Sequence, residues 1–315
     1  MSAAPSAPRR SRRRLDGVLL LDKPLGMTSN HALQAARRLF NAAKAGHTGT
    51  LDPLATGLLP LCFGEATKFS GELLGADKRY RATIQLGVTT TTADAEGEIL
   101  ARRPVAAGAE RLQEVLAQFV GEIDQVPPMH SALKHQGRPL YDYARAGVEI
   151  VRPARRVCIH SLRLCEWDAA TARLVVDVEC SKGTYVRTLA ADIGERLGCG
   201  AHLGGLRRTG IGVLDAATAH TLDAIERMPE AARDGVLLPV DALLHGLPAA
   251  HLGAVDASRL RHGQAVRWSG AADTRMRAYD GEGALIGLCH LDAEGWLCPQ
   301  RLVATEQAGP HAANS

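Results

Sequence analysis

The stretch of sequence best suited to chemistry is residues 46–60, Gly-His-Thr-Gly-Thr-Leu-Asp-Pro-Leu-Ala-Thr-Gly-Leu-Leu-Pro. Its glycines and its Asp-Pro step predict a constrained loop that displays one carboxylate, Asp52, near one imidazole, His47. A phosphate-binding P-loop would require a Lys-Ser/Thr pair after the last glycine, which this segment lacks. A metal site would require a further ligand beside His47 and Asp52. On spacing alone, Asp52 is either a catalytic carboxylate or a turn-forming residue before proline.

Two other segments carry side chains that could hold a flat, polar substrate. Tyr80 begins a stretch in which apolar and polar residues alternate through Leu86, as expected of a strand. Tyr185 and Arg187 follow the linker of residues 181–184, Ser-Lys-Gly-Thr. Taken singly, Tyr80 would be an ordinary core or interface aromatic, and Arg187 would be a surface arginine on a helix.

The helices and strands that must position these residues can be predicted from the periodicity of apolar residues and from the residues that interrupt helices and strands. We expect strands at 17–21, 80–86 and 174–180, and helices at 109–119 and 185–197. A further helix should begin after Thr28 or Ser29 as N-cap and run to about Lys44. Because strands and helices interleave without a regular βαβ rhythm, the sequence favours an α+β fold with a mixed or antiparallel sheet over a doubly wound one.

The chain of 315 residues is long enough for about two domains. We expect a disordered basic tail at 1–14, a main domain at 15–246, a small β module at 247–303 and a second tail at 304–315. Asp-Gly-Glu-Gly at 280–283 and Asp-Ala-Glu-Gly at 292–295 are plausible hairpin turns of that module.

Charge and cysteine content narrow the class of protein. Five of the 37 basic residues are arginines within residues 1–14, and without them 32 basic residues face 34 acidic ones. The body is thus nearly neutral, so any nucleic-acid surface must be a local patch. Seven cysteines without a C-x-x-C pair suit reduced thiols in a cytoplasm and make structural zinc improbable. No apolar run approaches the length of a membrane span.

Five motifs in order resemble those of the TruB family of tRNA pseudouridine synthases, which isomerise uridine 55 in the T-loop of tRNA. Residues 46–60 resemble the signature of the family. The other matching stretches are 17–26 with Asp-Lys-Pro-Leu-Gly, 78–81 with Lys-Arg-Tyr-Arg, 180–188 with Cys-Ser-Lys-Gly-Thr-Tyr-Val-Arg-Thr, and 200–208 with Gly-Ala-His-Leu-Gly-Gly-Leu-Arg-Arg. The likeness spans about residues 15–303. It implies a catalytic α+β domain interrupted by a thumb insertion at about 127–147, followed by a PUA-like module.

The resemblance implies that Asp52 is the catalytic nucleophile. Forming pseudouridine breaks the bond from ribose C1′ to N1, turns the uracil and rejoins it through C5. Asp52 could attack the base, attack the ribose or act on a ribose proton, and the sequence leaves these routes open. A closed pocket would favour protonation of Asp52, so the resemblance implies that Arg187 holds the carboxylate, which a planar guanidinium can do with two parallel hydrogen bonds.

The resemblance also assigns substrate-binding roles to four residues. Tyr80 would lie against the face of the extruded uracil, and Tyr185 would help to grip it. His47 would enter the space left by the flipped uridine, and Leu206 would form an apolar wall. Gly204-Gly205 before Leu206 replaces the larger residues expected there, which leaves the placement of Leu206 looser.

The expected partner is the T-arm of tRNA, without membrane, metal, cofactor or obligatory protein partner. Basic and aromatic residues alternate through 134–156, which suits a folded RNA loop but would also suit a solvated loop. Two alternatives stay open at this point. One is a related synthase that depends on a guide RNA, and the other is a tRNA-binding chaperone whose catalysis is dispensable.

Overall fold

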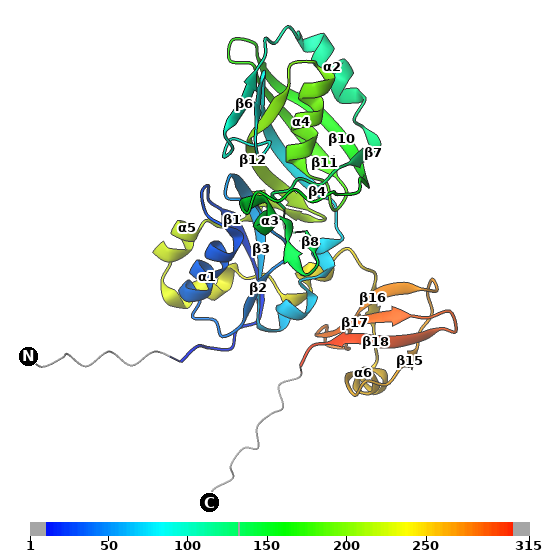
Figure 1. Ribbon diagram of the computed structural model, residues 1–315. Helices are drawn as coiled ribbons and strands as arrows, with labels where there is room; N and C mark the ends of the chain where they lie inside the picture. Colours follow the sequence, from blue (N-terminus) through cyan, green and yellow to red (C-terminus); the bar gives the residue numbers. More distant parts are fainter. Residues whose placement is uncertain (1–10, 132, 305–315) are drawn as a thin grey trace, which may run out of the picture.

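A computed structural model describes residues 11–131 and 133–304, and its centre is a long mixed sheet (Figure 1). Within these residues nine strands join this sheet, in the order β1-β3-β12-β4-β11-β10-β7, with β2 attached to β3 and β13 to β12. The β3–β12 pair is parallel, whereas the other pairs are antiparallel. The expected α+β fold with a mixed sheet is thereby confirmed. The strands are β1 (Gly17–Lys23), β2 (Ala45–His47), β3 (Ala55–Phe63), β4 (Lys78–Leu86), β7 (Gly121–Gln125), β10 (Arg155–Asp168), β11 (Arg173–Cys180), β12 (Ala201–Ile211) and β13 (Leu214–Asp215).

One half of the sheet is covered by helices α2 (Ala109–Ala117) and α4 (Val186–Arg196) (Figure 1). The alternation predicted for residues 80–86 is correct, because Ala82, Ile84 and Leu86 are buried in a core with apolar side chains of both helices. β5 (Val88–Thr90) and β6 (Ile99–Arg102) form a hairpin beside this half.

The other half, built on β1 and β3, packs against α1 (Ser29–Leu39) and α5 (Leu222–Arg227). Thr28 caps α1, as predicted, by accepting a hydrogen bond from the backbone N–H of His31. The expected end at Lys44 is wrong, because Asn41 takes a left-handed conformation with φ of 49° and the helix stops at Leu39. The 3-10 turns of the chain are η1 (Gly64–Phe69), η2 (Glu72–Leu74), η3 (Ala216–Thr218), η4 (Glu230–Val236) and η5 (Val240–Leu244).

Residues 11–14, which the sequence assigns to a disordered tail, are exposed, and Ser11 and Arg13 contact the body. Arg13 pairs as a β-bridge with Ala42, donates its Nε to the carbonyl of Phe40 and forms an ion pair with Asp234. Residues 1–10 and 305–315 lie outside the described part of the chain.

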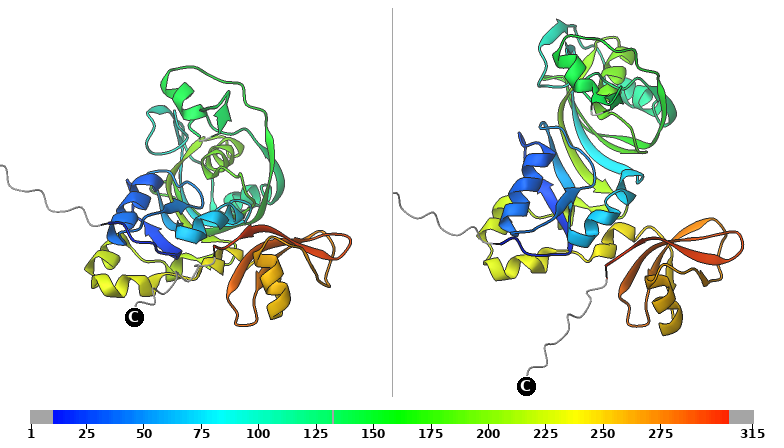
Figure 2. Two further views of the ribbon diagram at one scale, coloured as in Figure 1. Left: turned by 90° about the horizontal axis from the view of Figure 1, so that it is seen from below. Right: turned by 60° about the horizontal axis from the view of Figure 1, so that its bottom comes forward.

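Residues 126–154 connect β7 to β10 outside the sheet. This segment contains a small hairpin and a helix (Figures 1 and 2). These elements are β8 (Lys134–His135), β9 (Arg138–Pro139) and α3 (Leu140–Arg145). We call this segment the thumb.

The C-terminal part forms a second sheet of five strands, ordered β14-β16-β17-β18-β15, with helix α6 packed on it (Figure 2). Its two expected hairpin turns, at 280–283 and 292–295, join β16 to β17 and β17 to β18. The sheet is tied to the main body because Tyr279 donates to Asp241 at 2.7 Å and Arg275 pairs with Glu72 at 2.7 Å. The elements are β14 (Ala249–His251), α6 (Ala254–Arg261), β15 (Val266–Arg267), β16 (Thr274–Tyr279), β17 (Leu285–Leu291) and β18 (Trp296–Leu302).

Candidate active site

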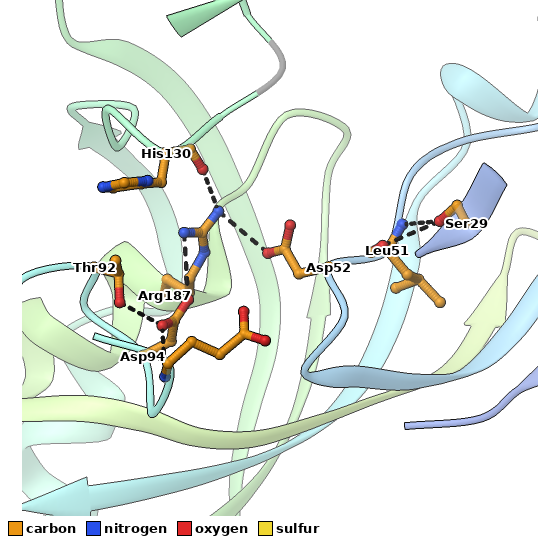
Figure 3. A network of polar contacts seen from close by, with 8 residues as sticks. Ser29, Leu51, Asp52, Thr92, Asp94, His130 and Arg187 are labelled. Carbon is orange, nitrogen blue, oxygen red and sulfur yellow. Dashed lines mark hydrogen bonds and ion pairs between the residues drawn. The ribbon is translucent and has the colours of Figure 1, made fainter. Parts of the chain in front are cut away.

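Asp52 lies on the loop between β2 and β3, and the backbone of this loop is anchored on both sides. Ser29, at the start of α1, accepts a hydrogen bond from the N–H of Leu51 and donates one to its carbonyl (Figure 3). The N–H of Gly26 donates to the carbonyl of Pro53 at 2.8 Å. The residue displaying the carboxylate is therefore held between two fixed neighbours.

Arg187, in the first turn of α4, joins Asp52 to a second acid. Its Nη2 lies 3.2 Å from Oδ2 of Asp52 and donates to the carbonyl of His130 at 2.6 Å, while its Nη1 lies 3.4 Å from Asp94 (Figure 3). The side chain of Arg187 is 7% exposed and that of Asp52 is 43% exposed. The guanidinium is thus shared among three partners, and the bidentate fork on Asp52 alone is not formed.

Asp94 is a member of the site that the sequence analysis missed. Its side chain is 4% exposed and accepts hydrogen bonds from Thr92 Oγ1 at 2.5 Å and from the N–H of Glu96 at 3.1 Å. The sequence signal that could have indicated Asp94 is an acidic residue among several threonines. In the structure these residues form a tight turn after a strand, where Ala93 has a φ of 58°. The pairing itself spans 93 residues and has no local pattern.

A cavity of about 220 Å³ opens beside the ion pair and gathers five of the six predicted residues. These five residues come from the 48–54 loop, from β4, from the start of α4 and from β12. The sheet and one helix therefore form the wall of the cavity together. The predicted residues that line it are Asp52, Tyr80, Tyr185, Arg187 and Leu206, joined by Thr50, Leu51, Ser131, Thr184 and Val186.

His47, the sixth, lines a neighbouring groove of about 420 Å³. Asp52 and Arg187 line this groove as well, and Tyr141 and Arg145 of the thumb form part of its wall. Burial, aided by the charge of Arg208, lowers the pKa of His47 below its ordinary value, so the imidazole is neutral at neutral pH. Its Nδ1 is buried without a hydrogen-bond partner.

Tyr80 faces a buried arginine that was also missed. Arg208 stands opposite Tyr80 in the β4–β12 register, is 3% exposed, and donates its Nε to the carbonyl of Leu58 at 2.7 Å. Burial raises the pKa of the Tyr80 phenol, and the positive charge of Arg208 opposes that rise. Tyr80 is therefore a neutral ring at neutral pH.

Tyr185 precedes α4 and is fixed through its backbone by Gln125 of β7. The N–H of Tyr185 donates to Gln125 Oε1 at 3.0 Å, and Gln125 Nε2 donates back to its carbonyl at 3.4 Å. Gln125 is 2% exposed, and burial raises the pKa of the Tyr185 phenol. The side-chain amide of Gln125 thus fixes the backbone just before the first residue of α4.

Leu206 keeps its place despite the two glycines before it. Its neighbours in the sheet register are Ala55 of β3 and Ala82 of β4. A Cβ at Gly204 or Gly205 would meet its nearest atom at 3.5 Å or 3.7 Å, which is ordinary contact distance. The glycines are therefore not required for close packing, and Leu206 lines the cavity with them in place.

Lys23, from the Asp-Lys-Pro motif, lies fully buried near the acids of the site. Its Nζ donates to the carbonyls of Pro24 at 2.9 Å and Met27 at 2.6 Å. Burial lowers the pKa of Lys23 to about 8, and the negative charges of Asp52 and Glu96 pull in the opposite direction. Lys23 thus holds the turn that leads into α1.

The basic and aromatic residues of 134–156 divide into two groups. In the thumb, Arg138 lies over the ring of Tyr143 at 5.1 Å, and Arg145 lies over that of Tyr141 at 5.5 Å. At the sheet edge, Arg156 of β10 pairs with acids of β7. Of the thumb group, Tyr141 and Arg145 line the groove that contains Asp52.

No cluster of three or more His, Cys, Asp or Glu side chains among the described residues could hold a metal ion. Within residues 11–131 and 133–304, no helix has the length and apolar character needed to cross a membrane.

The chain is similar to known proteins over nearly its whole length. The chain is 60% identical over 300 residues to tRNA pseudouridine synthase B of Thiobacillus denitrificans, covering 95% of this chain and 99% of the relative. It is 54% identical to the protein of the same name from Cupriavidus metallidurans, covering 96% and 98%. A crystal structure of a Cbf5-Nop10-Gar1 complex superposes with a TM-score of 0.68 at 26% identity, covering 88% of this chain and 78% of that one.

Family models match in three consecutive parts. Residues 37–186 match the N-terminal domain of the TruB family pseudouridylate synthases. Residues 187–245 match the tRNA pseudouridylate synthase B C-terminal domain, and residues 248–303 match the C-terminal model of pseudouridine synthase II TruB. These matches and the full-length relatives show that the chain belongs to the TruB family of pseudouridine synthases.

Proposed function

We propose that this pseudouridine synthase converts uridine 55 in the T-loop of tRNA to pseudouridine, with Asp52 as the nucleophile. The observation that carries the proposal is the Asp52–Arg187 pair at a cavity lined by Tyr80, Tyr185 and Leu206. The relatives named tRNA pseudouridine synthase B support tRNA as the substrate.

The ion pair keeps Asp52 ready to act as an anion. A guanidinium 3.2 Å away favours the charged carboxylate, and the second oxygen of Asp52 points away from Arg187 (Figure 3). In the reaction the C1′–N1 bond breaks, the uracil turns, and a C1′–C5 bond forms. C5 loses a proton and N1 gains one, so no atom or electron is added to the product.

The cavity requires the uridine to leave its stack before it can react. Extruding a base costs a few kcal/mol, and a loop that already holds the uridine loosely lowers that cost. Tyr80 would stack on the uracil, Tyr185 would grip it and Leu206 would wall the apolar side. His47, neutral and in the adjoining groove, would fill the vacated space in the RNA.

We further propose that the enzyme works in the cytoplasm without a guide RNA. The thumb residues Tyr141 and Arg145 border the same groove as Asp52, so the protein itself supplies a surface for the T-arm. All seven cysteines are free thiols, which is consistent with a reducing compartment. A guide-dependent synthase and a non-catalytic chaperone remain as the competing outcomes of the test.

The test uses purified chain, a T-arm hairpin containing uridine 55, and EDTA, with no other RNA or protein. Mapping pseudouridine should place the product at position 55 of both the hairpin and unmodified tRNA. His47→Ala should slow the hairpin reaction. A hairpin that reacts only after a guide RNA is added would favour the guide-dependent synthase, whereas tight binding of tRNA without any product would favour the chaperone.

A further inference from the structure

Cys158 belongs to a linear arrangement of thiol, imidazole and carboxylate that lies outside the cavity and the groove described above. Cys158 Sγ lies 3.6 Å from Nδ1 of His160, and Nε2 of the same ring lies 3.2 Å from Oδ2 of Asp77. The side chains of His160 and Asp77 are 39% and 52% exposed. This is the order in which a nucleophile, its base and the group that orients the base are placed in covalent catalysis.

The backbone fixes both ends of this arrangement. Cys158 and His160 lie two residues apart on β10, where its pairing with β11 is irregular, and their contact shows that the two side chains lie together, while Ile159 between them is fully buried in the core. The N–H of Cys158 donates to Ser181 Oγ at 2.9 Å, and its carbonyl accepts from the N–H of Ser181 at 2.8 Å. Asp77, just before β4, accepts through its carbonyl from Gly212 at 2.9 Å.

Within residues 11–131 and 133–304, no other cysteine has an imidazole within hydrogen-bond distance. Cys62, Cys180, Cys199 and Cys289 are buried. Burial raises the pKa of Cys62 to about 12, of Cys180 to about 11 and of Cys289 to about 12.

Cys165 and Cys298 are partly exposed, as Cys158 is. Partial burial and a neighbouring carboxylate, Asp177 or Asp292, raise the pKa of each thiol. Such surroundings oppose formation of a thiolate, whereas an imidazole beside a thiol assists it.

We propose that Cys158 is an activated thiol and a modification site for small disulfides. His160 takes the thiol proton, and Asp77 keeps the imidazole turned toward Cys158. The thiolate then attacks one sulfur of the disulfide, so that a Cys158–S–S–R bond forms and the S–S bond of the reagent breaks. The departing thiolate leaves as R–S–H with the proton from His160, so the disulfide is the oxidant and no other reactant is needed.

The experiment compares thiols within one molecule. Folded full-length protein is treated at pH 7 with a small excess of 5,5′-dithiobis(2-nitrobenzoate), quenched with acid at intervals, and mapped by peptide mass spectrometry. Cys165, on the same strand and similarly accessible, is the internal control. Cys158 should react about tenfold faster than Cys165.

Two variants separate activation from accessibility. His160→Gln removes the base, and Asp77→Asn removes the charge that orients it, while both leave the thiol uncovered. Each should bring the Cys158 rate close to that of Cys165 without changing the Cys165 rate, in protein with an unchanged melting temperature. An equal rate for Cys158 and Cys165 in the original chain would overturn the proposal, and so would a fast Cys158 that persists in folded His160→Gln protein. If either variant does not fold, the ratio in the original chain still decides.

Discussion

At the scale of single residues, the central feature of this enzyme is a guanidinium divided among partners. Arg187 contacts Asp52, Asp94 and the carbonyl of His130, so its orientation does not depend on Asp52 alone. A guanidinium presents its donors in a rigid, coplanar fork, whereas an ammonium group is a compact charge with three rotatable donors. Under the proposed function, Arg187 would position Asp52 as well as supply its countercharge.

Arg187→Lys should therefore behave as a severe substitution. Lysine keeps the charge but cannot reach Asp52, Asp94 and His130 in the same geometry, so the single-turnover rate should fall about a hundredfold. Arg196→Lys, in the last turn of the same helix, is the matched control and should leave the rate unchanged. A near-normal rate for Arg187→Lys with saturating tRNA would mean that the shared fork is unimportant.

Asp94→Asn tests the acid that the sequence analysis missed. Without the negative charge of Asp94, the guanidinium of Arg187 should tilt and hold Asp52 less accurately. This should lower the single-turnover rate by about tenfold to a hundredfold. Affinity for tRNA should change little, because only 4% of the Asp94 side chain is exposed. Glu98→Gln, an exposed acid nearby, serves as control, and equal rates for the two variants would contradict the role of Asp94.

The buried Lys23 makes stability depend on pH in a defined direction. Its folded-state pKa of about 8 lies below the ordinary 10.5, so above pH 8 the unfolded chain binds more protons than the folded one. The free energy of unfolding of the original chain should therefore rise relative to Lys23→Met, by about 2 kcal/mol between pH 7.5 and 9.5. Chemical denaturation at both pH values measures the difference, and a gap that stays constant or narrows would contradict it.

At the scale of secondary-structure elements, local sequence patterns predicted the strands and caps well. Contacts between residues distant in the sequence could not be predicted from such patterns. The alternation of β4 and the cap of α1 depend on neighbouring residues, and both match the structure. The end of α1 was misplaced because the apolar pattern continues through Phe40, whereas the chain turns at Asn41. Asp94 and Arg208 escaped notice because each acquires its role from a strand or helix distant in the sequence.

The placement of the predicted site residues depended on the family resemblance more than on periodicity. From spacing alone, Asp52 could be either a catalytic carboxylate or a turn-forming residue before proline. No local pattern linked it to Arg187, which follows 135 residues later. The structure brings five of the six residues to one cavity and puts His47 in the adjoining groove. Their roles in the reaction remain proposals that the variants test.

The thumb should contribute affinity and not chemistry. Arg145 is exposed and borders the groove, so Arg145→Ala should weaken tRNA binding and reduce the slope of log affinity against log salt by about 1. The single-turnover rate at saturating tRNA should be retained. Arg111→Ala, on the outer helix α2, should leave both quantities unchanged. A loss of rate at saturation in Arg145→Ala would place the thumb within the chemical step.

At the scale of the whole molecule, the C-terminal sheet is fastened to the catalytic body by apolar and polar contacts. Leu288 of β17 shares a core with Leu243 and Leu244 of η5, and Tyr279 bonds to Asp241. The sheet is therefore held at a fixed place beside the body, where it can extend the surface for RNA.

A chain that ends at Gly246 should keep its chemistry and lose binding energy. Its melting temperature should fall because Leu243 and Leu244 lose their cover, and its affinity for tRNA should decrease. Residues remote from the reacting atoms hold the RNA, so the rate at saturating tRNA should survive in truncated protein that is shown to be folded. Loss of that rate in a folded truncation would contradict this division of roles.

The most direct test of the account is the comparison of Asp52→Asn with the original chain on unmodified tRNA. Binding and pseudouridine formation are measured on the same preparation, the first by filter retention and the second by mapping. We predict product at uridine 55 with the original chain, no product with Asp52→Asn, and affinities that agree within several-fold. Measurable turnover by Asp52→Asn, beyond a mock purification, would contradict the assignment of Asp52 as the nucleophile.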